Sequence, residues 1–277
     1  MTNMLILAAK EIRDGYRNRW ITVMTIIMAG LAFVLALLGS APIGTTNISP
    51  LSVTVVSLSS LSIFFIPLIA LLLSYDSIVG EEEKGTLTLL LAHPVTRPAI
   101  AVGKFTGQLF ILAFAIVVGY GTATLAIAVT GDSAFLEQQW STFFKLLLSS
   151  ILLGAVFLAL GMLLSIWAKE RGTAAACAIG IWLLFVVLFD MVLLGVLGAS
   201  GTNFLSDSAI KWIMLGNPTD AYRMFNLTST DETAILSGMA GLRGDQGVPG
   251  TVLLALLVIW IVLPLTASCL LFQRRSV

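Results

Sequence analysis

Residues Tyr75–Lys104 read YDSIVGEEEKGTLTLLLAHPVTRPAIAVGK, and this stretch separates two long apolar runs. It contains three consecutive acids, Glu81, Glu82 and Glu83, followed by the short apolar segment Thr86–Ala92. A helix that crosses a bilayer needs ~20 apolar residues, so this segment is too short to span a membrane. We therefore expect it to lie on a membrane surface or to dock into another protein.

The composition is that of an integral membrane protein. Of the 277 residues, 58% are hydrophobic and 11% are charged, whereas a soluble domain carries about 25% charged residues. The formal net charge of zero argues against a nucleic-acid partner. The two cysteines, Cys177 and Cys269, fall inside apolar runs without a metal-ligand spacing, and we interpret them as packing residues.

The apolar runs predict an all-α membrane protein in which residues 1–277 form a single transmembrane domain. Residues 1–19 combine apolar residues at helical spacing with basic ones, which favours an amphipathic interfacial helix. The polar interval 199–250 precedes the last apolar run. We expect six spans, at about 20–38, 52–74, 105–130, 143–167, 173–198 and 251–272.

The basic residues predict the orientation of these spans. Six spans place both termini on one side of the membrane, together with residues 75–104. That side carries most of the basic residues, namely Lys10, Arg13, Arg17, Arg19, Lys84, Arg97, Lys104, Lys169, Arg171, Arg274 and Arg275. The other side has Lys211, Arg223 and Arg243, with Lys145 near the boundary. By the positive-inside rule, both termini are cytoplasmic and segment 199–250 lies on the outer side. We expect a bacterial inner membrane, in which that side is periplasmic.

The loops leave no room for a soluble catalytic domain. The sequence has no phosphate-cradling glycine loop, no His/Cys metal cluster and no nucleophile elbow. We therefore expect no catalytic residue, no bound metal and no directly bound cofactor. Energy for any work must come from a partner protein.

The central stretch resembles the signature of ABC-2-type permeases, the membrane subunits of ATP-binding-cassette transporters. In that family an acid-rich E-x-G-T stretch leads into a short apolar helix and then P-x-x-R. Here Glu83-Lys84-Gly85-Thr86, Leu87–Leu91 and Pro94-Val95-Thr96-Arg97 supply these parts. The resemblance implies a cytoplasmic coupling helix between spans two and three, driven by a separate ATPase that binds ATP and Mg. The residues to which it gives this function are Glu81, Glu82, Glu83, Gly85, Thr86, Leu87, Leu90, Pro94 and Arg97.

Local chemistry agrees with a short, capped helix in this place. Gly85 breaks the acidic turn, and Thr86 is a reasonable helix N-cap. The preceding acids suit the positive N-terminal end of a helix. Pro94 stops the helix, and His93 before it is biased away from helical geometry. From the residues alone, an ordinary interfacial turn is equally open.

Two further stretches, KEIRDGYRNRW at residues 10–20 and LGNPTDAYRMF at 215–225, are similar to permeases of the system that matures nitrous oxide reductase. This resemblance implies an ATPase partner and a periplasmic accessory protein, and we expect two copies of the chain around a shared two-fold axis. The output would be export of a sulfur species, or mechanical signalling, for the copper–sulfur site of that enzyme. Two alternatives stay open: an ABC-2 exporter of a drug, lipid or peptide, and a non-transporting anchor for a periplasmic complex.

Further polar candidates lie toward the predicted outer side. Asp190 is the one acid deep in a predicted span, ~26 Å from its start, and it is either a functional intramembrane site or a residue that reaches the outer interface. The segment 207–224 suits an interfacial helix or the docking face for a periplasmic partner. The docking candidates are Trp212, Asn217, Pro218, Tyr222 and Arg223. The nine Met residues fit core packing better than a copper relay.

Overall fold

The computed structural model describes residues 2–17, 19–39, 50–92, 95–130, 133–200, 212–228 and 248–275. These residues form helices and the turns between them, and no strand occurs among them. The long helices are α2 (Arg19–Gly39), α3 (Pro50–Ser74), α6 (Arg97–Thr130), α7 (Ser133–Trp167) and α13 (Gly250–Arg274). The shorter elements are α1 (Thr2–Arg17), α4 (Val79–Glu83), α5 (Thr86–Leu91), α8 (Arg171–Leu183), η1 (Leu184–Leu188), α9 (Phe189–Ser200) and α11 (Pro218–Leu227).

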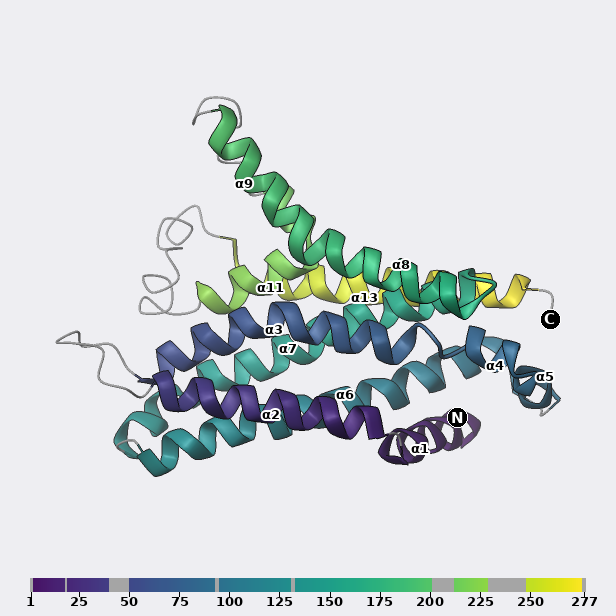
Figure 1. Cartoon of the computed structure of the whole chain (residues 1–277), viewed down its shortest axis with the longest axis horizontal. Coiled ribbons are helices and arrows are strands. Elements are labelled where there is room, and N and C mark those ends of the chain that lie inside the picture. Colours follow the sequence, from purple (N-terminus) through teal and green to yellow (C-terminus); the bar gives the residue numbers. More distant parts are fainter. Residues whose placement is uncertain are drawn as a thin grey trace.

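The long helices run side by side in one bundle (Figure 1). Helix α7 contacts α3, α6 and α13, and α1 packs on α6. Helices α1, α4 and α5 lie at one end of the bundle, and both chain termini lie at the same end (Figure 1). We call this the α4 end and the opposite one the α11 end. The shared position of the termini agrees with an even number of spans.

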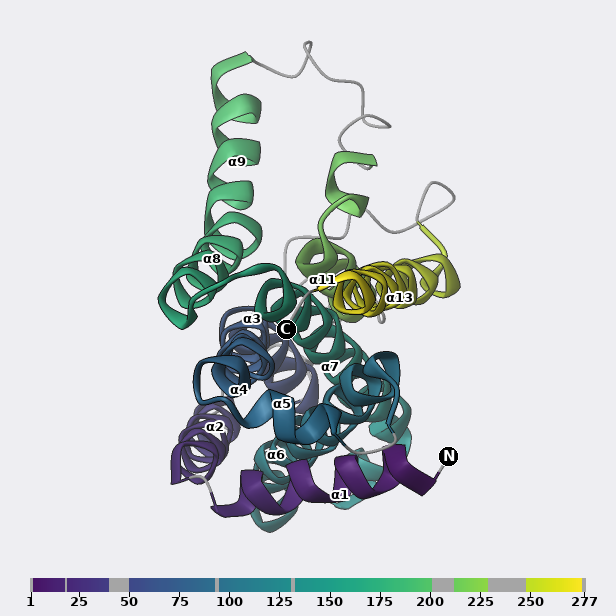
Figure 2. The same ribbon diagram turned by 90° about the vertical axis from the view of Figure 1, so that its right-hand side faces the viewer.

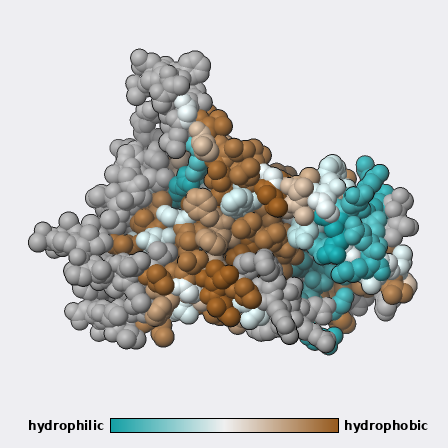
Figure 3. Space-filling model, in the orientation of Figure 1, coloured by the Kyte–Doolittle hydropathy of each residue, from teal (hydrophilic) through white to brown (hydrophobic). Residues whose placement is uncertain are grey.

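Five helical stretches are long and apolar enough to cross a membrane, and they coincide with the last five predicted spans. They are Ser52–Glu83, Arg97–Leu125, Trp140–Trp167, Arg171–Leu193 and Gly250–Arg274. The first predicted span, 20–38, falls on α2, whose described side chains supply the shorter apolar stretch Thr25–Val34. Six spans therefore remain a prediction. Hydrophobic residues cover the middle of the molecule, and hydrophilic ones gather at the α4 end (Figure 3).

Helices α6 and α7 are longer than the spans predicted at 105–130 and 143–167. They contain 34 and 35 residues, which corresponds to ~50 Å each at 1.5 Å per residue. This length exceeds the ~30 Å core of a bilayer. Polar residues before the apolar run of α7, such as Glu137, have good helix propensity. The helix therefore begins before the apolar run that defines the predicted span.

Helix α7 approaches its neighbours closely at two glycines. A Cβ atom on Gly161 would lie 1.9 Å from Ser74 Oγ, and one on Gly154 would lie 2.5 Å from Leu112 Cδ2. Small residues at such crossings allow helix backbones to come together within a membrane. As a result, 72% of the most apolar stretch of α7 is buried, and α7 forms the centre of the core.

The fifth predicted span, 173–198, is not one regular helix. The π-helix η1 separates α8 from α9, and α9 stands away from the bundle (Figures 1 and 2). Of the most apolar part of the stretch Arg171–Leu193, only 11% is buried. Its exposed apolar side chains include Leu184, Leu188, Met191 and Val192. This span is therefore the most weakly packed of the five.

Candidate functional site

Helix α4 is fixed to the end of α7 through its own backbone. The N–H groups of Ile78 and Val79 donate to Ser165 Oγ at 2.9 and 3.1 Å. The first N–H groups of a helix have no partner within the helix, so Ser165 serves as an N-cap that another helix provides. Ile78 and Val79 are also fully buried. The three glutamates that follow therefore have a defined position at the α4 end.

The first glutamate, Glu81, shares a buried lysine with α1. Lys104 Nζ lies 2.8 Å from Glu81 Oε1 and 2.7 Å from Glu11 Oε1, and Lys104 is 2% exposed. Lys10 Nζ approaches the same Glu81 oxygen at 3.9 Å. A buried charge is costly unless it is paired. Lys104 thus joins α6, on which it lies, to both α1 and α4.

The other two glutamates reach two further elements. Glu83 Oε1 accepts a hydrogen bond from the backbone N–H of Arg171 at 2.7 Å, where α8 begins. Arg171 Nη2 also lies 2.5 Å from Asp76 Oδ2. Glu82 Oε2 lies 2.5 Å from Nη2 of Arg275, directly after α13. The three glutamates therefore connect α4 to α6, α8 and the end of α13.

Arg97, predicted as a coupling residue, caps the end of α13. Its Nη1 donates to the carbonyl oxygens of Phe272 at 3.1 Å and Gln273 at 3.3 Å, and to that of Arg275. Carbonyl groups at a helix C-terminus carry partial negative charge, so the guanidinium stabilises this helix end. The predicted helix stop, His93-Pro94, lies outside the described residues.

Helix α5 lies where the sequence predicts a short helix, but its N-cap differs from the prediction. The cap is Gly85, at φ 69°, and Thr86 is the first helical residue rather than the cap. The turn between α4 and α5 takes the left-handed conformation that glycine adopts most readily. The Thr86 hydroxyl instead donates to the backbone oxygen of Glu81 at 3.1 Å. Thr86 thus ties α5 to α4.

Helix α5 has one buried face and one exposed face. Leu87 is fully buried, and Leu90 packs partly against the core. Leu89 is 67% exposed. Residues that are two positions apart in a helix are rotated by about 200° around its axis, so Leu87 and Leu89 point to opposite sides. The sequence prediction included Leu87 and Leu90 and missed Leu89, which helical periodicity could have separated from its neighbours.

The acids of this segment form ion pairs with basic residues that were not among the predicted site residues. Lys104, Arg171 and Arg275 are far from those acids in the sequence, or lie on other elements. The available signal was their charge, because all three fall on the same predicted side of the membrane as the acids. Which acid pairs with which base depends on helix packing, and charge counting does not show it.

At the α11 end, Asp190 forms an ion pair with Arg223 of α11. Arg223 Nη2 lies 2.6 Å from Asp190 Oδ2, and Nη1 lies 3.1 Å from Asp220 Oδ1. Asp220 is fully buried. Burial raises the pKa of Asp220 to about 6, and the nearby Arg223 opposes this rise. The intramembrane candidate Asp190 is therefore part of a charge cluster that joins α9 to α11.

The start of α11 is bonded to the π-helix. Asn217 is the N-cap, and its Oδ1 accepts from the Thr219 N–H at 3.0 Å. Asn217 Nδ2 and Thr219 Oγ1 both donate to the carbonyl oxygen of Phe185, at 2.9 and 3.1 Å. A π-helix has an irregular backbone hydrogen-bond pattern and occurs frequently at functional sites. Here the cap of α11 holds the irregular turn of span five.

Most of the predicted docking residues are built into the bundle. Tyr222 is fully buried, and its hydroxyl lies 2.9 Å from Ser150 Oγ. Three others are buried or half-buried: Asn217, Pro218 and Arg223. Trp212 is 74% exposed, so among the five candidates it has the most side-chain surface for a partner.

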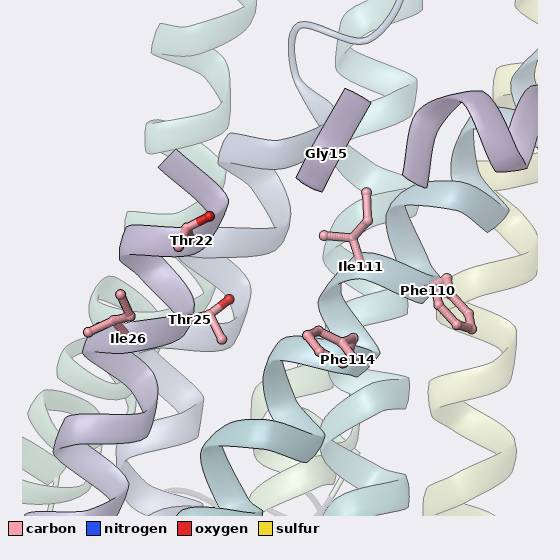
Figure 4. Close-up of a pocket in the computed structure, with 7 residues that line it drawn as sticks. All are labelled: Gly15, Thr22, Thr25, Ile26, Phe110, Ile111 and Phe114. Carbon is pink, nitrogen blue, oxygen red and sulfur yellow. The ribbon is translucent and has the colours of Figure 1, made fainter. Parts of the chain in front are cut away.

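A pocket of about 140 Å³ opens between α1, α2 and α6. The pocket is lined by Thr22, Thr25 and Ile26 of α2, by Phe110, Ile111 and Phe114 of α6, and by Gly15 of α1 (Figure 4). The lining is mostly apolar, and binding sites for small solutes add polar groups that orient the ligand. We therefore place the candidate functional site at the α4 end.

The chain matches known proteins over nearly its whole length. The family described as ABC-2 family transporter protein matches residues 5–277. A probable ABC transporter permease protein NosY of Stutzerimonas stutzeri is 42% identical over 275 residues, which cover 99% of each chain. A protein of the same name from Pseudomonas aeruginosa PAO1 is 42% identical over 271 residues, 98% of each chain. Together with its membrane-crossing helices, these matches show that the chain belongs to the ABC-2 family of transporter permeases.

Proposed function

We propose that this permease is NosY-like and couples ATP hydrolysis on a separate, NosF-like ATPase to an output on the periplasmic side. The ATPase binds ATP and Mg, and this chain supplies no catalytic residue. The observation that carries the proposal is the two-faced helix α5, with Leu87 fully buried and Leu89 67% exposed. A short helix with an exposed apolar side chain suits docking into a groove of a partner.

The α4 end faces the cytoplasm in this proposal. Both termini lie at this end (Figure 1). Basic residues of the predicted cytoplasmic side, among them Lys104, Arg171 and Arg275, pair there with acids of the coupling segment. The positive-inside rule supports this orientation in a bacterial inner membrane. The ATPase then meets α5 from the cytoplasm.

A push on α5 has a defined route into the bundle. Helix α5 contacts α4 and is bonded to it through the Thr86–Glu81 hydrogen bond. Helix α4 in turn bonds to α6, α8 and the end of α13 through its three glutamates. Because all three glutamates lie on one short helix, a displacement of α4 acts on α6, α8 and α13 together.

The transporter works as a homodimer in this proposal. The span made of α8, η1 and α9 buries only 11% of its most apolar stretch, which leaves an apolar face for lipid or for a second copy. A two-fold pair built on one self-complementary patch is the commonest oligomer. Two six-span copies then enclose a pathway between them.

The output serves assembly of the copper–sulfur site of nitrous oxide reductase, together with a NosD-like periplasmic protein. It consists of export of a sulfur species or of mechanical signalling to that protein. The support is 42% identity, over nearly the full length, to two permeases named NosY. The predicted periplasmic segment 199–250 lies largely outside the described residues. Trp212 is the most exposed of the large apolar side chains that are described in it.

Co-purification with the ATPase encoded nearest to this gene tests the proposal. We expect the intact chain to retain the ATPase in detergent and Leu89→Glu to lose it at least tenfold, because a carboxylate cannot enter an apolar groove. Leu89→Met is the matched control, since it keeps an apolar side chain of similar size. Leu87→Ala should instead lower stability, by about 2–5 kcal/mol.

Two results would contradict the proposal. If the intact chain binds no ATPase, the permease does not couple through α5, and a membrane anchor becomes the better interpretation. If Leu89→Glu retains the ATPase as well as Leu89→Met does, the docking surface lies elsewhere.

A further inference from the structure

The residue that follows α13, Arg275, is bound to both α7 and α4. Arg275 follows the end of α13, and its guanidinium contacts two other elements. It donates to the carbonyl oxygens of Ile166 and Ala168, the latter at 2.8 Å, and it pairs with Glu82. The side chain of Arg275 is 13% exposed, so a residue near the chain terminus is largely enclosed by the bundle.

These contacts make Arg275 the C-cap of a helix to which it does not belong. Helix α7 ends at Trp167, and the carbonyl groups that Arg275 contacts are among the last that a helix leaves without partners. A cation at this place is also favoured by the partial negative charge of the helix end. Arg275 thus fixes the end of α13 on the end of α7.

A second arginine, Arg97, binds the backbone at the end of α13. Arg97, at the start of α6, holds the carbonyl oxygens of Phe272 and Gln273 and that of Arg275 itself. The backbone of Arg275 is therefore bound by Arg97, while its side chain binds α7 and Glu82. The α13 terminus is held on both sides and has little freedom to move independently of α4.

Helix α4 and Arg275 also share one anchor on α7. Ser165 accepts the first N–H groups of α4 with its hydroxyl, and its backbone oxygen lies 3.4 Å from Arg275 Nη1. The Glu82–Arg275 pair closes a triangle between α4, α7 and α13. A displacement of α4 therefore pulls on span six through Arg275.

From this geometry we infer that Arg275 is a positioning residue of the coupling apparatus, which makes span six move with α4 when the ATPase acts. The inference rests on the proposed function, because it assumes that α5 receives a push. It concerns the connection from α4 to α13, which is one of the three that the glutamates of α4 make. The route depends on one side chain at the end of the chain.

The test is the ATP-dependent movement of span six in the complex with the ATPase. A nitroxide label is placed at Val252→Cys, an exposed position at the far end of α13, in a chain with Cys177 and Cys269 replaced by Ala. In a homodimer this gives one distance between two labels. We expect ATP to change this distance in the otherwise unaltered chain. The control is Arg274→Ala, because Arg274 is adjacent to Arg275 but exposed, and this variant should keep the change.

Arg275→Ala and Glu82→Ala should both lose most of this change, at least threefold, while the ATPase still co-purifies because Leu89 is untouched. Glu82→Ala leaves the Arg275 cap on α7 in place, so it separates the link from a merely structural contribution. The inference is overturned if Glu82→Ala or Arg275→Ala keeps the ATP-dependent change, or if the unaltered label pair does not respond to ATP although the ATPase is bound. Failure of the proposed function itself looks different, since the intact chain would then bind no ATPase at all.

Discussion

Two charged clusters occupy opposite ends of the bundle, and they connect the chain in different ways. At the α4 end, four acids are paired with Lys104 of α6, Arg171 of α8 and Arg275, which follows α13. At the α11 end, Arg223 lies between Asp190 and Asp220 and joins α9 to α11. The first cluster fixes many helices to one another, whereas the second fixes one helix to one neighbour.

The difference extends to how helix ends are capped. At the α4 end, side chains from other elements satisfy the ends of four helices: Ser165 for α4, Glu83 for α8, Arg275 for α7 and Arg97 for α13. At the α11 end, α11 carries its own cap at Asn217. Because each of these helix ends is capped by a side chain of another element, a displacement of one element changes the hydrogen bonds at the ends of its neighbours. The α4 end is therefore suited to transmission and the α11 end to local positioning.

Removing the buried lysine should break the α4 end most severely. Lys104→Met leaves Glu11 and Glu81 without their shared cation, and loss of one partner from a buried ion pair costs about 3–5 kcal/mol. Lys10→Ala is the control, because Lys10 is 45% exposed and 3.9 Å from the same Glu81 oxygen, and such pairs contribute ~0.5 kcal/mol. Denaturant unfolding in detergent measures both. Similar losses for the two lysines would show that burial of Lys104 does not set its contribution.

Removing Arg223 should give a smaller loss that depends on pH. Arg223→Ala leaves the buried Asp220 without its cation, at a cost of roughly 2–3 kcal/mol. The pKa of Asp220 is already raised to about 6 by burial, and without Arg223 it rises further. An acid whose pKa is raised in the folded state loses stability as pH increases through that range. The variant should therefore be less destabilised at pH 5 than at pH 8.

The matched control for this second prediction is Asp220→Asn in the Arg223→Ala background. The amide carries no charge to leave unpaired, so the double variant should recover part of the stability and lose the pH dependence. A pH-independent loss in Arg223→Ala would show that packing, rather than charge, accounts for the contribution of this arginine.

The smallest effect on stability is expected at Trp212, which is 74% exposed. Trp212→Ala should change the free energy of unfolding by less than about 0.5 kcal/mol, as surface substitutions usually do. Its binding to a NosD-like periplasmic protein, measured by co-purification, should nevertheless weaken. Tyr222→Phe serves for comparison, since its hydroxyl bonds to Ser150 inside the bundle and cannot reach a partner. Equal binding by both variants would remove Trp212 from the docking surface.

The sequence alone predicted the helical class and the place of most helices, because apolar runs of ~20 residues leave few alternatives. It also placed a short helix at Thr86–Leu91, where the structure has α5. The sequence did not predict the partners of the acids. Glu82 and Arg275, for example, are far apart in the chain, and nothing in the sequence indicates that they form a pair. The N-cap at Gly85 and the exposed face at Leu89 depend on how α5 sits on α4. The interruption of span five by a π-helix has no signature in its uniformly apolar residues.

The π-helix also sets the rotational phase of everything that follows it in span five. Its i→i+5 bonding takes one more residue into the turn than α-helical bonding does. Without one residue between Leu184 and Leu188, the span would continue as a regular helix, with Asp190 rotated by about 100° around the axis. The carboxylate would then turn away from Arg223. The ion pair between α9 and α11 therefore depends on the one additional residue that the π-helix takes into its turn.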